Sequence, residues 1–151
     1  MKLTIELVPS TCWCSNVRDH ISADDWNIVK KYTSNLAGNC CEICKGVGPK
    51  WPVECHEVWE YDDKKNIQKL IRTIALCPDC HQVKHFGLAS IKGQGQKALE
   101  HFMKVNKVND EQALKYIGKA FAIYEKRSKQ EWILNIDWLN STFNCNVKSK
   151  R

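Results

Sequence analysis

Two cysteine pairs, CEIC at residues 41–44 and CPDC at residues 77–80, constrain this chain more than any other feature of its sequence. Each C-x2-C turn can offer two thiolates to one ion, and two such turns complete the tetrahedral ligand set of a structural zinc. Cys40 could replace Cys41 by a slip of one residue, but Cys41 gives the better spacing. We therefore expect one Zn²⁺ bound by four residues: Cys41, Cys44, Cys77 and Cys80.

Cysteine is abundant in this chain, and metal binding explains that abundance better than disulfides do. The sequence has nine cysteines among 151 residues. Its opening lacks the long apolar region of a signal peptide, and no apolar run approaches the roughly 18 residues of a membrane helix. We therefore expect a cytoplasmic protein without membrane association, in a compartment where thiols stay reduced. The cysteines without a matching partner are expected to be small core residues: Cys12, Cys14, Cys55 and Cys145.

Two histidines follow the second cysteine pair at once, and a site closed by four sulfurs leaves both of them unused. Proline is tolerated as a first helical residue, so residues 78–86 are expected to form a helix that Gly87 ends. His81 and His85 lie four positions apart and would then share one face of that helix. Two imidazoles on one face can approach a second ion.

The partner of these histidines is expected on a preceding strand. The segment VECHEVWEY, residues 53–61, is typical of a short strand, and it contains three side chains that can bind metal or carry a proton: Glu54, His56 and Glu57. Strand alternation places Glu54 and His56 on the same face. A site formed by this strand and the helix would keep coordination positions open for a substrate.

The order of these motifs resembles the HNH endonucleases, that is, the ββα-metal or His-Me finger nucleases of the subgroup with a four-cysteine structural zinc. The resemblance rests on C-x2-C, a strand with a histidine among acidic residues, and LC-x2-CH-x3-H, and it covers about residues 37–88. It implies an α+β fold with a ββα-metal finger core, flanked by additional helices and a C-terminal strand. Residues 1–151 are accordingly expected to form a single HNH nuclease-like domain.

The resemblance also implies an activity, the metal-dependent hydrolysis of DNA phosphodiester bonds by nicking or by double-strand cleavage. His81 and His85 correspond to ligands of a catalytic divalent ion, Mg²⁺ or another, with Glu54 as a further ligand. His56 corresponds to the base that activates water, and imidazole titrates close to the neutral pH that this role needs. A rival alignment makes His56 a metal ligand and gives the role of base to Glu57.

One position departs from the family pattern. The asparagine that orients the base in the family lies shortly before the first cysteine of LC-x2-CH, and Arg72 stands there, with Thr73 next. Gln68 and Asn66 lie further back. Either one of these polar groups orients the base, or catalysis is impaired. In the second case the chain would be a catalytically weak, zinc-stabilised module that binds nucleic acid or protein on the same fold.

The distribution of charge favours a polyanionic partner such as DNA. The formal net charge is +6, and residues 101–151 hold ten basic against five acidic side chains. A helix expected after Asn109 carries the candidate phosphate contacts on one face: Lys115, Lys119 and Lys126. A merely solvated helix face would show the same pattern. The sequence is also compatible with a homodimer or with a phage or bacterial protein partner.

Hydrophobic periodicity and capping residues predict the elements around this core. Asn109 and Gln112 form a capping-box pattern before the longest helix. The further elements are a strand over residues 2–8, a helix over 23–36 capped by Ser22, a core strand over 70–76, a helix over 96–105 and a C-terminal strand over 132–139.

Overall fold

The centre of the fold is a long antiparallel hairpin, seen in a computed structural model that describes residues 1–14 and 16–145. The hairpin consists of β1 (Glu54–Asp62) and β2 (Ile67–Leu76), and the short strand β3 (Ile133–Asn135) pairs in parallel with β2. Glu54 pairs with Leu76. The start of β1 therefore lies beside the residue that leads into Cys77.

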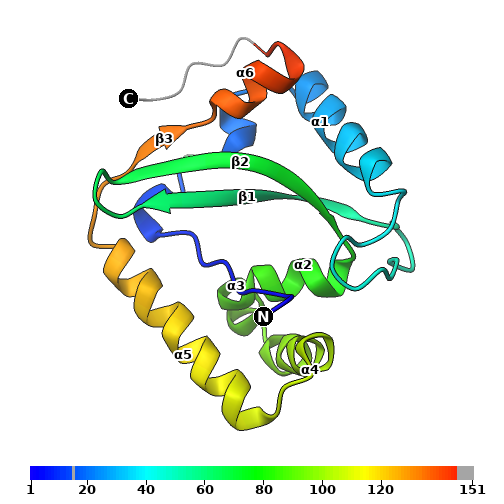
Figure 1. Cartoon of the computed structure of the whole chain (residues 1–151), viewed down its shortest axis with the longest axis vertical. Coiled ribbons are helices and arrows are strands. Elements are labelled where there is room, and N and C mark those ends of the chain that lie inside the picture. The colour runs from blue at the N-terminus through cyan, green and yellow to red at the C-terminus, as the bar shows by residue number, and fades with distance from the viewer. Residues whose placement is uncertain (15, 146–151) are drawn as a thin grey trace.

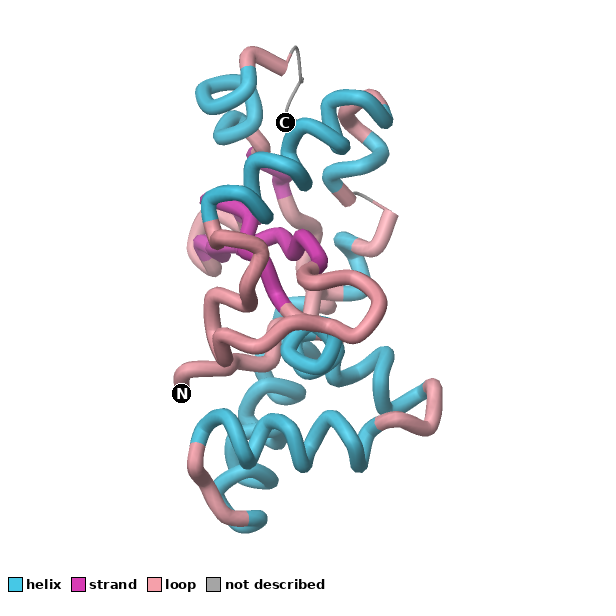
Figure 2. The backbone as a smooth tube through the Cα atoms, turned by 90° about the vertical axis from the view of Figure 1, so that its right-hand side faces the viewer, coloured by secondary structure: helices cyan, strands magenta, loops and turns pink. Residues whose placement is uncertain are grey.

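Helices cover both faces of this sheet (Figure 1). On one side lie α1 (Ala23–Leu36) and α6 (Asp137–Phe143). On the other side lie four helices: α2 (Pro78–Lys84), α3 (Phe86–Ile91), α4 (Gly95–Asn106) and α5 (Asp110–Arg127). Two single turns of 3-10 helix, Ser10–Cys12 and Val17–Asp19, precede α1. Figure 2 likewise has the strands between an upper and a lower group of helices.

Each face of the sheet has its own apolar core. Leu76 and Phe102 belong to the buried cluster that packs α2, α3, α4 and α5, whereas Val29 and Leu70 belong to the cluster beneath α1 and α6. Fully burying one such side chain contributes about 1.5–3 kcal/mol. The hairpin is thus held from both sides, which makes it a rigid support for side chains near its open end.

The structure confirms the expected combination of a small sheet with flanking helices. Ser22 caps α1 by accepting a hydrogen bond of 3.0 Å from the Asp25 N–H. α5 begins with the predicted capping box, in which Asn109 and Gln112 exchange side-chain to backbone hydrogen bonds. In the described part of the chain, no helix is both long and apolar enough to cross a membrane.

Two predicted strands are wrong in whole or in part. Residues 2–8 are irregular, and the Glu6 N–H donates to the Lys84 carbonyl at 3.1 Å rather than to a strand. The predicted C-terminal strand ends at Asn135, because the Asn135 side chain accepts a hydrogen bond from the Asp137 N–H at 3.1 Å and α6 begins there.

Two further expectations also need correction. Gly87 does not end the helix that begins at Pro78, because α2 already ends at Lys84 and Gly87 lies inside α3. Cys14 is exposed and is not a core residue.

Candidate metal centres

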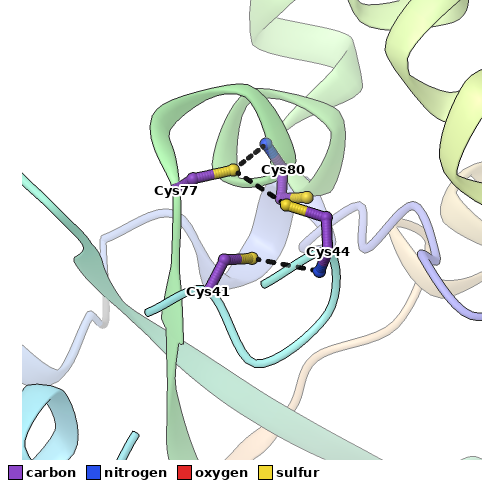
Figure 3. Close-up of side chains that lie close together, drawn as sticks. All are labelled: Cys41, Cys44, Cys77 and Cys80. Carbon is purple, nitrogen blue, oxygen red and sulfur yellow. Dashed lines mark hydrogen bonds between the residues drawn. The ribbon is translucent and has the colours of Figure 1, made fainter. Parts of the chain in front are cut away.

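The four cysteines of the two C-x2-C pairs meet between the turn after α1 and the first turn of α2 (Figure 3). Their sulfur atoms all lie within 4.8 Å of one another, and the Sγ atoms of Cys44 and Cys77 are 3.5 Å apart. A tetrahedron with Zn–S bonds of about 2.3 Å has edges of about 3.8 Å. The cluster therefore has the size and the ligand type of a structural metal site, such as a zinc site, as the sequence predicted.

Backbone N–H groups turn toward the sulfurs of this cluster. Cys44 N–H donates to Cys41 Sγ and Cys80 N–H donates to Cys77 Sγ, both at 3.5 Å. Gly46 N–H donates to Cys44 Sγ at 3.4 Å, and a Cβ at Gly46 would lie 3.3 Å from that sulfur. Glycine therefore allows the backbone to approach the thiolate closely.

Three thiols of the cluster have pKa values displaced by burial and by their contacts with one another. A hydrogen bond from Cys80 lowers the pKa of Cys41 to about 4. The same bond, together with burial, raises the pKa of Cys80, and burial raises the pKa of Cys77 to about 11. Without a cation, one thiolate would sit beside neutral thiols. A divalent metal instead favours the thiolate form of every ligand.

His101 contacts this cluster from outside, a role that sequence reasoning missed. Its Nε2 lies 3.2 Å from Cys80 Sγ, so a protonated Nε2 can donate to the thiolate. His101 comes from α4, which packs against α2 in the same core. No spacing rule could have found this contact, because it depends on how two helices pack.

A second cluster consists of His56, His81 and His85, whose ligand nitrogen atoms all lie within 4.8 Å of one another. The Nε2 atoms of His81 and His85 are 3.1 Å apart. Two nitrogens bound to one ion at about 2.1 Å and at a right angle would be about 3.0 Å apart. His81 and His85 thus have the spacing of two ligands of one metal ion.

Carboxylates contact the outer side of this histidine cluster. Glu54, predicted to be a metal ligand, bonds to Nδ1 of His81. This bond fixes a proton on Nδ1 and leaves Nε2 of His81 free to bind metal. Glu6, which sequence reasoning missed, has its Oε2 atom 3.1 Å from Nε2 of His56.

The surroundings of His56 distinguish it from Glu57. His56 is 3% exposed, and its Nδ1 is buried with no hydrogen-bond partner among the residues that the structure describes. Strand alternation carries Glu57 to the opposite face, together with Cys55, which contacts Thr33 of α1. The structure therefore brings His56 to the two helix histidines and does not bring Glu57 there.

Burial keeps the helix histidines neutral. It lowers the pKa of His81 despite the hydrogen bond to Glu54, which raises it. Burial, reinforced by the charges of His56 and His81, lowers the pKa of His85 to about 4. Neutral imidazole is the form that binds a metal ion.

The side chains near the family's asparagine position have other partners. Arg72 pairs with Glu42, a residue of the first C-x2-C turn. Thr73 bonds to Thr33 on the α1 face of the sheet. Gln68 donates to the Tyr61 hydroxyl at 3.1 Å, and Asn66 takes the left-handed conformation (φ 52°) in the hairpin turn. None of these contacts involves His56.

The candidate phosphate contacts lie along α5. Lys119 lines a cavity of about 340 Å³ together with Glu6 and the aromatic side chains of β1. Lys115 lines an adjoining hollow that also includes Lys119. Lys126 lies near the end of α5, where its charge contributes to lowering the pKa of Asp63. Lys119 thus shares a cavity with Glu6, the carboxylate that contacts His56.

The chain matches no family model, no curated protein and no solved structure. The function of this chain is therefore inferred from the two clusters and their surroundings.

Proposed function

We propose that this chain is a metal-dependent DNA endonuclease of the HNH type, with β1, β2 and α2 as a ββα-metal core. The observation that carries the proposal is the cluster of His56, His81 and His85, with ligand atoms within 4.8 Å, on a hairpin and the helix that follows it. The adjacent four-cysteine cluster supports the same family, because the two ligand sets are independent of each other.

The histidine cluster fits a divalent ion. Two neutral imidazoles face each other through Nε2, and Glu54 fixes the outer nitrogen of His81. A bound ion would stabilise the charge that develops on the phosphate and on the leaving 3′ oxygen. Imidazole ligands suit Ni²⁺ better than Mg²⁺ or Mn²⁺, which prefer oxygen. We therefore rank nickel ahead of magnesium and manganese.

The base in this proposal is His56. Its buried Nδ1 takes a proton from a water molecule, and the oxygen of that water attacks the phosphorus. The bond between phosphorus and the 3′ oxygen breaks, and the 3′ oxygen takes a proton from solvent. The carboxylate of Glu6, next to Nε2, balances the positive charge that His56 gains.

Exposure indicates where the substrate would approach. The side chains of Glu54 and His81 are 41% and 23% exposed, whereas that of His56 is 4% exposed. A phosphate would therefore arrive from the side of Glu54 and His81. Lys119, across the cavity that Glu6 also lines, would hold a neighbouring phosphate.

A plasmid-nicking assay with Mn²⁺, Ni²⁺, Mg²⁺ or no metal tests this function. His56→Ala should lower the rate by about 100-fold or more, since general base catalysis contributes about 10²–10⁴-fold. Glu60→Gln is the matched control for Glu57→Gln, because Glu60 is an exposed carboxylate of the same strand. If Glu57→Gln lowered the rate as strongly as His56→Ala does, the assignment of the base would be wrong.

A zinc-stabilised nucleic-acid-binding module is the second candidate. The observation that favours it is Arg72, which stands in place of the family's asparagine and pairs with Glu42. Duplex binding that weakens with salt, without nicking under any of the four metal conditions, would replace the nuclease by this module.

A further inference from the structure

The irregular N-terminal segment brings one carboxylate to two buried side chains. Glu6 Oε2 lies 3.1 Å from His56 Nε2, and Glu6 Oε1 accepts a hydrogen bond from Lys84 Nζ. Lys84 also donates to the Thr4 hydroxyl at 2.7 Å. His56 and Lys84 are both almost completely buried. This one carboxylate is the hydrogen-bond partner of His56 Nε2 and also balances the positive charge of Lys84.

Glu6 forms an ion pair in this position. Its Oε1 atom accepts a hydrogen bond from the buried Lys84 ammonium, and a neighbouring positive charge favours the ionised form of a carboxylate. An ionised carboxylate can only accept hydrogen bonds. The Nε2 atom of His56 must therefore carry a proton, and the lone pair of the neutral ring is then on Nδ1.

The Nδ1 atom of His56 is the one that faces no partner. It is buried and has no hydrogen-bond partner within residues 1–14 and 16–145. The His56 ring centroid lies 4.9 Å from that of His85 and 5.2 Å from that of His81. The atom with the free lone pair thus belongs to a ring that lies against the two helix histidines.

The segment that carries Glu6 is fixed at several points. Lys84 lies on the same face of α2 as His81, three positions later, and its carbonyl accepts from the Glu6 N–H at 3.1 Å. Near the chain start, Asn106 Oδ1 accepts hydrogen bonds from the N–H groups of Lys2 and Leu3, at 2.8 and 2.9 Å. Glu6 is therefore held relative to the helix that carries the proposed metal ligands.

We infer that Glu6, held by Lys84, is the positioning residue for His56 and makes Nδ1, rather than Nε2, the atom that takes the proton from water. This inference rests on the proposed nuclease function. In the family an asparagine orients the base, and this inference gives that role to Glu6. Arg72, Thr73 and Gln68 do not fill it, because they contact other residues.

Two double variants isolate the accepting oxygen. Glu6→Leu with Lys84→Met removes both charges and the acceptor, whereas Glu6→Gln with Lys84→Met removes both charges but keeps an acceptor oxygen. Neither variant leaves Lys84 buried and unpaired. Thermal unfolding would show whether both variants are folded. Nitrogen-15 NMR of the histidine rings then reports which nitrogen of His56 carries the proton, with no need for activity.

The wild type and the glutamine variant should show the Nε2–H form of His56, and the leucine variant should show a mixture of both forms. The nicking rate of the leucine variant should fall about 10- to 100-fold below that of the glutamine variant. A proton on Nδ1 in the wild type would overturn the inference even if neither variant folded. Equal tautomers and equal rates in the two variants would also overturn it.

The experiment separates this inference from the function on which it rests. If the wild type nicked no DNA, the nuclease proposal and the catalytic role of His56 would both fail. The tautomer measurements would still decide whether Glu6 orients the ring.

Discussion

The four-cysteine cluster should contribute a large part of the stability of this protein, and Cys80→Ser is the sharpest test. Cys80 and Cys41 are completely buried and belong to the same apolar core as Phe102. Serine at position 80 would replace a buried metal ligand by a hydroxyl that is a poor partner for zinc. The matched control is Cys14→Ser, because Cys14 is exposed and outside the cluster.

The size of the effect follows from the ligand count. A structural zinc site contributes on the order of 10 kcal/mol to folding, so one of four ligands accounts for roughly 2.5 kcal/mol. A buried hydroxyl without a partner costs about 1–3 kcal/mol more. The sum, about 3.5–5.5 kcal/mol, is comparable with the whole stability of a marginally stable domain, since domains range over about 5–15 kcal/mol. It corresponds to a fall in Tm of roughly 7–22 °C.

Metal content and thermal unfolding should be measured on the same samples. Cys80→Ser should bind zinc more weakly and unfold at a lower temperature, while Cys14→Ser should keep both properties of the wild type. Well-folded native protein that contained no metal would contradict a structural zinc site at these four cysteines. A loss of metal from Cys80→Ser without any change in Tm would also contradict it.

Four further changes test other parts of the structure. His101→Ala should weaken zinc binding by about 10- to 100-fold in a chelator competition, because the thiolate loses an outer donor. Gly48→Ala should lower Tm, since a Cβ there would lie 2.2 Å from the Trp51 carbonyl oxygen. Asn109→Ala should cost about 1 kcal/mol in urea unfolding through loss of the capping box. Lys119→Gln should reduce the slope of log affinity for duplex DNA against log salt by about 1, and an unchanged slope would exclude it as a phosphate contact.

Local patterns in the sequence were sufficient wherever a few neighbouring residues determine the geometry. The C-x2-C spacing predicted that the four cysteines could share one ion, since each tight turn places its own two sulfurs. The separation of His81 and His85 predicted that they would meet, because four positions make one helical turn. Asn109 predicted the start of α5 through its cap.

Contacts between distant segments could not be predicted in the same way. The alternation at residues 2–8 is real, since Leu3 and Ile5 are buried, but the segment packs against helices and pairs with no strand in the described part of the chain. Alternation reports burial on one side, and a strand also needs a ladder of hydrogen bonds. Glu6 meets His56 only because this segment crosses α2, and nothing in the sequence near either residue indicates that crossing.

The candidate metal ligands between Cys77 and His85 lie close together in the sequence, and this closeness has a structural consequence. A helix of seven residues such as α2 is not stable by itself in water. The four-cysteine cluster holds its first turn, where Cys77 is the N-cap, and the Glu6–Lys84 ion pair holds its last turn. His81 lies between these two anchored turns, and His85 directly follows Lys84. Their orientation therefore depends on the four-cysteine cluster, which holds the start of the same helix.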